Sequence, residues 1–296
     1  MSFKSVCWDI TSKCNEHCLF CYRDEYCKES SLNKNKEILK KLLVNGVGKI
    51  SFVGGEPLLY KNLFELIEYG KSIDSKTQYS LTTNALLLAD FDENNKFTIN
   101  VPLLERIVKT FNWITFSLDA PVESIQTNMG RNRNHIPRVI ALLDYIRKHN
   151  YDIKIKINTV VSKVNVDTLQ DLIPVLENFK VDRWKLFKFL PSRGSALLNK
   201  DVFEIDDDKY SECINRLASM TNIKISYNSQ IDFLNTYITI NSEGHLSVYD
   251  GIQYKFVLDL SKDSCASVFE YVNQDLHNER RTDYMLGDKN EQKTNN

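Results

Sequence analysis

Short apolar runs alternate with helical patterns along the first two thirds of the chain. The runs have the length of strands and are rich in β-branched and aromatic residues. The predicted strands are residues 5–11, 49–53, 78–82, 113–118, 153–159 and 183–189. Between them, apolar residues recur at helical spacing, as in Ile136, Val139 and Ile140. Strands that alternate with helices predict an α/β fold with a parallel sheet built of βα units.

Within each predicted strand, alternate residues form an apolar set and a polar set. Ile114 and Phe116 oppose Thr115 and Ser117, for example. A parallel sheet covered by helices on both faces is instead nearly all apolar. A sheet with one face in solvent would also explain the alternation, but helices between all the strands disfavour it. We therefore predict a partial (βα)6 TIM-like barrel with helices outside and a polar, ligand-filled interior. Its site is expected at the carboxyl ends of the strands.

The final third of the chain has a different pattern. Residues 207–219 are expected to form a helix, and "TYITINSEGHLSVYD" predicts a β-hairpin around its Asn-Ser-Glu-Gly turn. We expect residues 1–190 to form the barrel core, and residues 191–280 a C-terminal helix and β-hairpin extension that closes the site. Residues 281–296 are charged and poor in apolar side chains, which predicts a disordered tail. Residues 90–97 are expected to form an exposed loop.

Charge and hydropathy disfavour several classes of protein. Lys and Arg number 38 and Asp and Glu 39, a net charge of -1, which argues against a protein that coats nucleic acid or an anionic membrane. No apolar run approaches the roughly 20 residues of a membrane span. The N-terminus enters a strand-like pattern at once, so we expect neither a signal peptide nor an amphipathic anchor. We expect a cytoplasmic protein that is a monomer.

Cysteine usage adds the first chemical signal. Three of the seven cysteines, Cys14, Cys18 and Cys21, fall within eight residues directly after the first predicted strand. An odd count with such a group favours a reducing compartment and a metal site over a disulfide framework. The C-x3-C-x2-C spacing favours a [4Fe-4S] cluster with one open iron. Two alternatives stay open: zinc with His17 or Cys27 as fourth ligand, or a redox pair that uses only C-x2-C.

A second motif, "GGEP", ends the second predicted strand at Gly54 to Pro57. Its glycines permit a close backbone approach to a ligand, and Glu56 can accept a hydrogen bond from an amino group. By itself, Gly-Gly is also an ordinary turn. Placed one βα unit after the three cysteines, the motif resembles the radical S-adenosylmethionine (SAM) superfamily.

This resemblance implies cofactors and residue roles. The three cysteines would hold a [4Fe-4S] cluster whose unique iron binds the amino and carboxylate groups of SAM. By matching position, the SAM amino group would contact Gly54, Gly55 and Glu56. The SAM ribose would contact Thr83 and Asn84, and the SAM carboxylate would contact Ser117 and Arg131. Without the other motifs, a capping turn would equally explain Thr83 and Asn84.

Cations lie on the polar faces of several predicted strands. Lys49 begins the second strand, Lys156 and Asn158 share a face of the fifth, and Arg183 and Lys185 share a face of the sixth. Cations that converge inside a barrel repel one another unless a polyanion joins them, and a triphosphate is the natural partner. The alternative is that long side chains reach solvent at the strand ends; we expect this for two neighbouring lysines, Lys154 and Lys188.

A closer resemblance follows from longer motifs. "GKISFVGGEPLL", "MGRNRNH", "IKINTVVSKVNVD" and "DRWKLFKFLP" are similar to viperin and its prokaryotic relatives, from about residue 5 to residue 250. In that family, the cations that match Lys49, Lys156, Arg183 and Lys185 bind a nucleoside triphosphate, with Asn158 nearby. A tyrosine that matches Tyr237 stands near the ribose; packing at the barrel mouth explains Tyr237 equally well. The stretch after Cys21 and the tail after residue 250 do not match, and we expect them to contact the base.

The resemblance implies a lyase-type reaction. SAM is consumed to methionine and 5′-deoxyadenosine, and CTP, UTP or GTP is converted to its 3′-deoxy-3′,4′-didehydro analogue by 4′-hydrogen abstraction and loss of water. Tyr237 is expected to deliver the final hydrogen or proton, and a flavodoxin- or ferredoxin-like protein the electron. The product would terminate polymerase chains, which implies an antiviral or antiphage role. The alternatives are another radical SAM enzyme, such as a sugar-nucleotide decarboxylase or a glycyl-radical activase, and a zinc module without activity.

Overall fold

The computed structural model describes residues 4–23, 28–91, 97–228, 234, 237–275 and 277–278. All predicted strands are present and lie parallel to one another. They are β1 (Ser5–Thr11), β2 (Lys49–Gly54), β3 (Gln78–Thr83), β6 (Trp113–Ser117), β7 (Lys154–Val161) and β8 (Arg183–Lys188). They form the middle of one large sheet with the strand order β12-β11-β10-β1-β2-β3-β6-β7-β8-β9.

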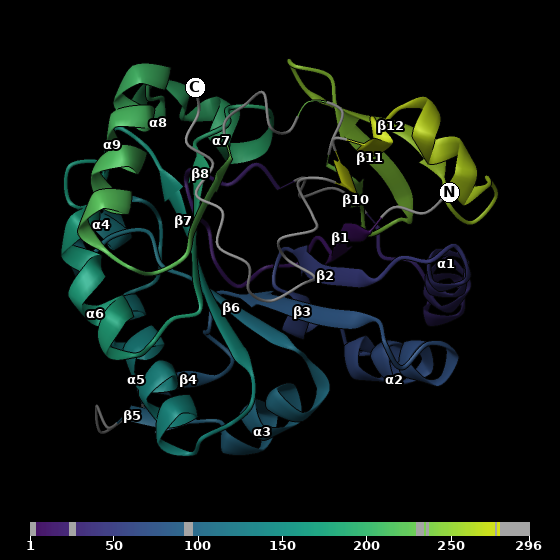
Figure 1. Ribbon diagram of the computed structural model, residues 1–296, viewed down its shortest axis with the longest axis horizontal. Helices are drawn as coiled ribbons and strands as arrows, with labels where there is room; N and C mark the ends of the chain where they lie inside the picture. The colour runs from purple at the N-terminus through teal and green to yellow at the C-terminus, as the bar shows by residue number, and fades with distance from the viewer. Residues whose placement is uncertain are drawn as a thin grey trace.

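Helices cover the outer side of this curved sheet, which does not close into a full barrel (Figure 1). The longer ones are α1 (Leu32–Val44), α2 (Leu63–Ile73), α3 (Val101–Thr110), α5 (His135–Lys148), α6 (Ile173–Asn178) and α9 (Asp207–Met220). The predicted apolar faces of the strands pack under them. Trp8, Phe52, Phe116, Ile157 and Trp184 are fully buried in this core. The predicted partial α/β barrel is confirmed.

The opposite, inner face of the same strands keeps partial exposure at some positions. Asp9, Val53, Ser117 and Asn158 keep partial exposure, whereas their neighbours on the outer face have none. Because both sets belong to the same central strands, this difference means that accessible space lies on the concave side of the sheet. The alternation in the sequence therefore reports the interior of a barrel, as predicted, rather than a face turned to bulk solvent.

Additional strands extend the sheet at both edges. These are β9 (Ile225–Asn228), parallel to β8, and β10 (Thr239–Ile240), β11 (His245–Tyr249) and β12 (Tyr254–Asp259) beyond β1. β10 and β11 form the predicted antiparallel hairpin, and the helix expected at 207–219 is α9. β9 and β12 were not predicted. The remaining short helices are η1 (Pro57–Leu59), α4 (Glu123–Asn128), η2 (Leu169–Leu172), α7 (Gly194–Leu198), α8 (Lys200–Phe203) and η3 (Cys265–Glu270).

The prediction of an exposed loop at residues 90–97 is wrong at both ends of that range. β4 (Ala89–Phe91) and β5 (Phe97–Ile99) pair antiparallel, and their two phenylalanine rings meet edge to face at 5.2 Å. Arg138 from α5 fixes β4, since its Nε donates to the carbonyl of Ala89 at 2.6 Å. Aromatic cross-strand pairs stabilise short hairpins, and the sequence pattern gave no period long enough to reveal this one.

Some predictions fall outside the described residues: the disordered tail at 281–296 and any role for Cys27. Within the described ranges, no helix is both long enough and apolar enough to cross a lipid bilayer.

Candidate active site

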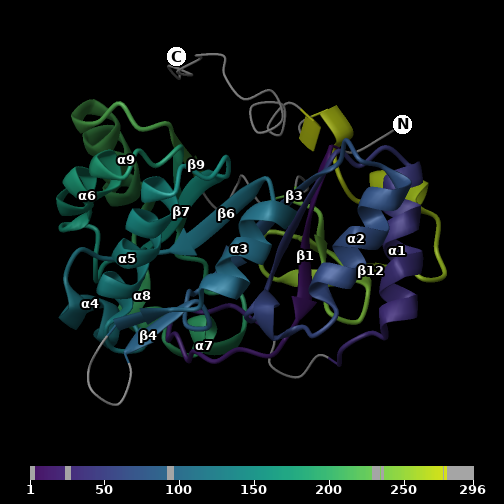
Figure 2. The same ribbon diagram turned by 90° about the horizontal axis from the view of Figure 1, so that it is seen from below.

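The three clustered cysteines lie in the connection that follows β1. Figure 2 shows this connection running below the strand ends, beside α7. Backbone hydrogen bonds hold it from three sides: Glu56 N donates to Lys13 O at 2.7 Å, Leu19 N to Met129 O at 3.0 Å, and Ala196 N to Cys21 O at 2.9 Å. The cysteine loop, which we define as residues 12–23, is therefore fixed by the end of β2, the end of α4 and the start of α7.

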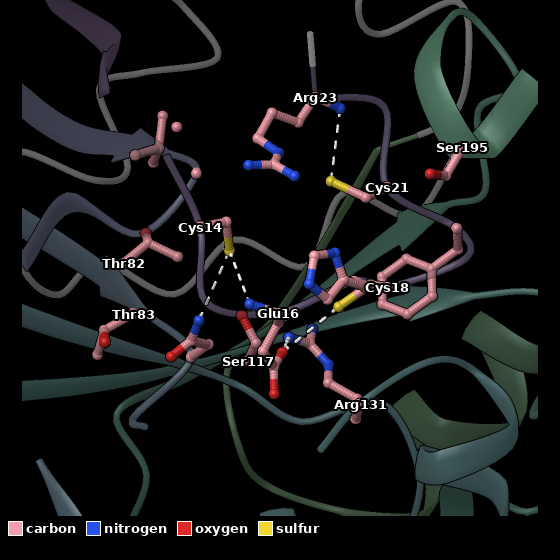
Figure 3. A pocket seen from close by; sticks show the side chains of 16 residues that line it. Cys14, Glu16, Cys18, Cys21, Arg23, Thr82, Thr83, Ser117, Arg131 and Ser195 are labelled. Carbon is pink, nitrogen blue, oxygen red and sulfur yellow. Dashed lines mark hydrogen bonds and ion pairs between the residues drawn. The ribbon is translucent and has the colours of Figure 1, made fainter. Parts of the chain in front are cut away.

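The sulfur atoms of Cys14, Cys18 and Cys21 border one space (Figure 3). All three are free thiols, and burial raises the pKa of each of them. Buried thiolates need positive charge nearby, which metal ions supply. Among the described residues, no three Cys, His, Asp or Glu side chains are close enough to hold a single metal ion. Three thiolates that border one space (Figure 3) suit a cluster in which each thiolate binds a different iron.

One pocket of about 810 Å3, partly open to solvent, gathers nearly all the residues predicted for cluster and SAM binding. Those in its lining are Cys14, Cys18, Cys21, Gly54, Gly55, Thr83, Asn84, Ser117 and Arg131. They come from the ends of β1, β2, β3 and β6 and from the turn after α4. The carboxyl ends of parallel strands thus bring together residues that are far apart in the sequence.

The glycines of the "GGEP" motif serve the protein backbone as much as a ligand. A Cβ at Gly55 would lie 1.9 Å from the carbonyl oxygen of Lys13, and Gly54 has φ +126°. Gly130 is similar, since a Cβ there would lie 2.7 Å from the carbonyl oxygen of His17. These three positions let the segments after β2 and α4 pack directly against the cysteine loop. The prediction that the glycines admit a ligand is therefore incomplete.

Glu56 lies behind the pocket wall and joins two of its loops. Its Oε2 accepts from Asn84 N at 2.8 Å and its Oε1 from Leu58 N at 3.1 Å. Burial raises the pKa of this carboxyl group to about 7, although these backbone donors act against the shift. Glu56 therefore links the end of β2 to the end of β3, whatever else it binds.

Arg131 is buried between two carboxylates. Its Nη1 lies 2.6 Å from Glu16 Oε2, and its Nη2 and Nε lie 2.8 and 3.0 Å from Asp119 Oδ2. Burial acts against the charge of Glu16, yet Arg131 and His135 hold the pKa of Glu16 below its ordinary value. His135 forms a local hydrogen bond from Nε2 to Ser117 O at 2.7 Å. The guanidinium group thus arrives at the pocket already oriented from two sides.

Sequence reasoning missed several residues of the pocket lining: Glu16, Phe20, Arg23 and Ser195. Glu16, Phe20 and Arg23 belong to the cysteine loop, where a charged or aromatic residue between the ligating cysteines or just after them is the signal that could have revealed them. Ser195 comes from α7, more than 170 residues along the chain, and nothing in the sequence places it there.

The predicted substrate cations lie deeper in the barrel. Lys49, Lys156, Arg183 and Lys185 are all buried, with 3 to 9% of their surface exposed. In the strand register, Lys156 lies opposite Arg183 and Asn158 opposite Lys185. Lys49 Nζ and Arg183 Cζ lie 4.9 and 6.0 Å from the centre of the Trp113 ring, so these two cations approach the same indole. The four cations, which we call the cation patch, occupy inner positions of β2, β7 and β8.

Lys154 and Lys188, both predicted to reach solvent, differ in exposure. Lys154 is exposed, although its Nζ also lies 5.4 Å from the centre of the Trp113 ring, whereas the side chain of Lys188 is only 11% exposed and its Nζ pairs with Asp207 Oδ1 at 2.6 Å. Neither belongs to the cation patch.

Polar atoms without hydrogen-bond partners accompany the cation patch. Among the described residues, Ser80 Oγ, Thr115 Oγ1 and Asn158 Oδ1 are buried and unsatisfied. All three are on the inner faces of β3, β6 and β7. An unsatisfied buried polar group costs about 1–3 kcal/mol, so such a group indicates a place where a polar ligand binds.

Tyr237 connects the cation patch to the strands beyond β1. Its hydroxyl accepts from Lys185 Nζ at 2.5 Å and donates to Asn228 Oδ1 at 3.1 Å. The ring is 7% exposed and packs against Tyr249. The side chain therefore reaches the inner face, where the resemblance predicts a ribose.

Comparison with known proteins identifies the class to which this site belongs. The radical SAM superfamily matches residues 8–174. The structure of SuiB from Streptococcus suis bound to S-adenosylmethionine is similar over 95% of this chain and 68% of that chain, with a TM-score of 0.68 and 18% sequence identity. That similarity shows the fold alone.

Curated relatives narrow the class. An S-adenosylmethionine-dependent nucleotide dehydratase from Flammeovirga pacifica is 30% identical over 250 residues, which cover 81% of this chain and 80% of the relative. One from Selenomonas ruminantium is 24% identical, with coverages of 88% and 92%. The chain therefore belongs to the radical SAM superfamily and, within it, to the S-adenosylmethionine-dependent nucleotide dehydratases. It is a radical SAM enzyme whose cofactors are a [4Fe-4S] cluster and SAM, as the motifs predicted.

Proposed function

We propose that this enzyme removes water from a nucleoside triphosphate to give the 3′-deoxy-3′,4′-didehydro analogue, which terminates polymerase chains and serves antiviral or antiphage defence. The observation that carries the proposal is the cation patch. Its four side chains lie on the inner face of the sheet whose strand ends hold the cysteine pocket. The dehydratase relatives are named for a nucleotide substrate, and a triphosphate is the part of a nucleotide that would need this much positive charge.

Electrostatics support a polyanion at the cation patch. Four buried cations on the inner face of one sheet are costly to desolvate, and a bound triphosphate offsets that cost with charge-assisted hydrogen bonds. The unsatisfied hydroxyls of Ser80 and Thr115 can donate further hydrogen bonds to phosphate oxygens. Asn158, opposite Lys185, is placed to accept from a ribose hydroxyl.

The cysteine pocket would hold the cofactors at the strand ends. When bound, the cluster and SAM supply an electron and the 5′-deoxyadenosyl group that takes a hydrogen atom from the substrate. We assign the cluster to Cys14, Cys18 and Cys21 and the SAM contacts to the remaining predicted residues of the pocket. Arg131, held by Glu16 and Asp119, can present its outer edge to a carboxylate. The chain's task is to orient the ribose C4′–H toward this pocket and to exclude water.

Tyr237 is the residue we assign to the final hydrogen or proton delivery. Lys185 donates to its oxygen, so the phenolic hydrogen points toward Asn228. A ribose bound beside Lys185 would lie within reach of this hydroxyl group.

We further propose a monomeric, cytoplasmic enzyme served by a flavodoxin- or ferredoxin-like donor, without nucleic-acid or membrane partners. The free thiols support a reducing compartment, and the balanced charge gives no general attraction to polyanions. We also propose that residues 191–280 close the site, since α7 contacts the cysteine loop and Tyr237 contacts Lys185.

The direct test is incubation of the anaerobically reconstituted, dithionite-reduced enzyme with SAM and each of CTP, UTP, GTP and ATP. We expect one nucleotide to raise 5′-deoxyadenosine formation well above background and to yield a nucleotide lighter by one water. If none of the four does so, the proposal fails. A glycyl-radical activase would need a protein partner instead, so a Lys156→Ala, Lys185→Ala double variant would leave its activity largely intact.

A further inference from the structure

An aromatic surface continues from Tyr237 away from the cation patch. Tyr237 and Tyr249 form a small apolar cluster, against which Cys7, Phe187 and Tyr254 pack. This cluster adjoins the cation patch, because Lys185 Nζ donates to the Tyr237 hydroxyl and lies 4.7 Å from the centre of the Phe187 ring. If the phosphates of a nucleotide lie on the patch and its ribose beside Tyr237, its base can extend over this aromatic cluster.

Flat groups gather at the far end of this surface. The rings of Tyr22 and Tyr254 stack at 5.9 Å with an interplanar angle of 11°. The Arg193 guanidinium carbon lies 5.9 Å from the Tyr22 ring and 5.0 Å from the Tyr254 ring. Arg193 is fixed there, because its Nε donates to the carbonyl of Tyr22 at 2.9 Å. We call Tyr22, Tyr254 and Arg193 the planar cluster; such groups bind heterocyclic bases by stacking.

The planar cluster has surface available for a ligand. Tyr22 exposes 41% of its surface. Yet burial, together with Tyr254 and Asp9 nearby, raises the pKa of its hydroxyl well above the ordinary value. Asp9, on the half-buried inner face of β1, is one of the groups that act on this hydroxyl, so it lies close to Tyr22.

Asp9 is the acidic group in this region. It points to the inner face of β1, two residues after Cys7, and is half-buried. Within the described part of the chain, its carboxylate has no hydrogen bond, and Arg193 is the cation that acts on it. Burial raises the pKa of Asp9 to about 6, with Arg193 acting against the shift. An ionised carboxylate can only accept hydrogen bonds, so this site calls for a ligand that donates one.

We propose that Asp9 selects the base of the nucleotide by accepting a hydrogen bond from an exocyclic amino group, while the base lies against the planar cluster. The enzyme therefore prefers an amino-bearing base to uracil. This inference rests on the proposed function. Uracil would direct a carbonyl oxygen at the carboxylate in place of the amino group of cytosine, and two acceptors repel. A site built around such a hydrogen bond discriminates strongly against an analogue that lacks the donor.

CTP and UTP are the pair that tests this inference, since their bases differ in the group at position 4 and in N3, which carries a hydrogen only in uracil. We expect the wild-type enzyme to use CTP at least about tenfold better than UTP in kcat/KM, as one specific base contact provides. In Asp9→Asn, whose amide both donates and accepts, the ratio should fall to within about threefold. Asp144→Asn, an exposed substitution on α5, is the control and should keep the wild-type ratio.

Experiments with purine nucleotides identify which base carries the amino group that Asp9 binds. If GTP is the substrate that raises 5′-deoxyadenosine most, GTP and ITP replace the pyrimidine pair, because ITP lacks only the 2-amino group. If ATP is, ATP and ITP are compared. The same loss of preference in Asp9→Asn is expected in each case.

A second measurement covers the case in which Asp9→Asn does not load the cluster. Calorimetric binding of the two paired nucleotides needs no cluster turnover and should show the same loss of preference. Equal use of the paired nucleotides by the wild type, or a ratio unchanged in Asp9→Asn, would overturn the inference while the dehydratase proposal stands. If no nucleotide raises 5′-deoxyadenosine in the wild type, the proposed function itself fails.

Discussion

The cysteine pocket and the cation patch lie on the same inner surface but are built in different ways. In the pocket, charged groups already satisfy one another: Arg131 pairs with Glu16 and Asp119, and Glu56 binds two backbone N–H groups. At the cation patch, charges of one sign are concentrated, and nearby polar atoms on β3, β6 and β7 have no partner among the described residues. The first region is assembled before any ligand arrives, whereas we propose that a ligand completes the second.

The largest expected effect is on the cysteine pocket. Replacing any one of Cys14, Cys18 and Cys21 by Ala removes a thiolate that the cluster needs, so we expect at least a roughly thousandfold loss of 5′-deoxyadenosine formation. Iron content after anaerobic reconstitution should fall with it. Cys213→Ala is the control: Cys213 lies on the buried face of α9, outside the pocket, and its variant should load normal iron.

The pre-assembled ion pairs predict a stability effect that needs no cofactor. Arg131→Ala leaves two buried carboxylates without their cation, so we expect a loss of about 3–5 kcal/mol in the free energy of unfolding. Denaturant titration of the apoprotein measures it. Arg133→Ala, two residues away and exposed, should change the same quantity by less than about 0.5 kcal/mol. Equal losses of stability in the two variants would contradict the claim that ion pairs already hold the cysteine pocket together before a ligand binds.

The cation patch predicts a loss confined to the nucleotide. In Lys156→Ala we expect kcat/KM for the nucleotide to fall about 10- to 100-fold, because a charge-assisted bond to phosphate is worth about 1.5–3 kcal/mol. SAM affinity should not change. Lys154→Ala offers a matched control on the same strand, since Lys154 is exposed; its kcat/KM should stay within about twofold of wild type. A loss of SAM affinity in Lys156→Ala would show that the two regions are not separate.

Tyr237 lies at the edge of the cation patch and predicts an uncoupled reaction. Tyr237→Phe keeps the ring packed on Tyr249 but removes the hydroxyl that Lys185 and Asn228 hold. If that hydroxyl delivers the final hydrogen or proton, dehydrated product should fall about 100-fold while 5′-deoxyadenosine forms at a near-normal rate. The measurement is the ratio of dehydrated product to 5′-deoxyadenosine in the same reaction. If this ratio stays at the wild-type value, Tyr237 does not deliver the final hydrogen or proton.

The smallest effect concerns Asp9 and pH. Because burial raises its pKa to about 6 from an ordinary 3.8, the folded protein holds this proton more tightly than the unfolded chain does. The contribution of Asp9 to the free energy of unfolding is therefore most favourable below pH 4, where Asp9 is protonated, and this contribution is lost as pH rises through 6. Asp9→Asn should therefore melt roughly 2–6 °C above wild type at pH 8 and at nearly the same temperature at pH 4. Identical melting curves at both pH values would contradict the placement of the carboxylate.

Much of the core could be predicted from the sequence because its signals are local. Alternation within each strand identified the outer core, as at Ile114 and Phe116, and the inner cations, as at Lys156. The cysteine spacing and the "GGEP" turn located the pocket because parallel strands end at the same edge. These features depend on period and spacing, which a single sequence displays.

The remaining features depend on contacts between distant segments. Ser195 reaches the pocket through the packing of α7 on the cysteine loop, and no local pattern encodes that packing. β9 has four residues, too few for a period to be visible. The stacking of Tyr22 on Tyr254 joins segments more than 230 residues apart. Only the folded chain shows that this pair lies beside Asp9.

The most direct measurement of the central claim uses a nucleoside triphosphate deuterated at the ribose 4′ carbon. The account places that carbon between the cation patch and the cysteine pocket, so the reduced enzyme with SAM should transfer the deuterium to 5′-deoxyadenosine. Mass spectrometry should then show 5′-deoxyadenosine carrying one deuterium and a dehydrated nucleotide that has lost it. Unlabelled 5′-deoxyadenosine formed beside a nucleotide that keeps its deuterium would contradict the account.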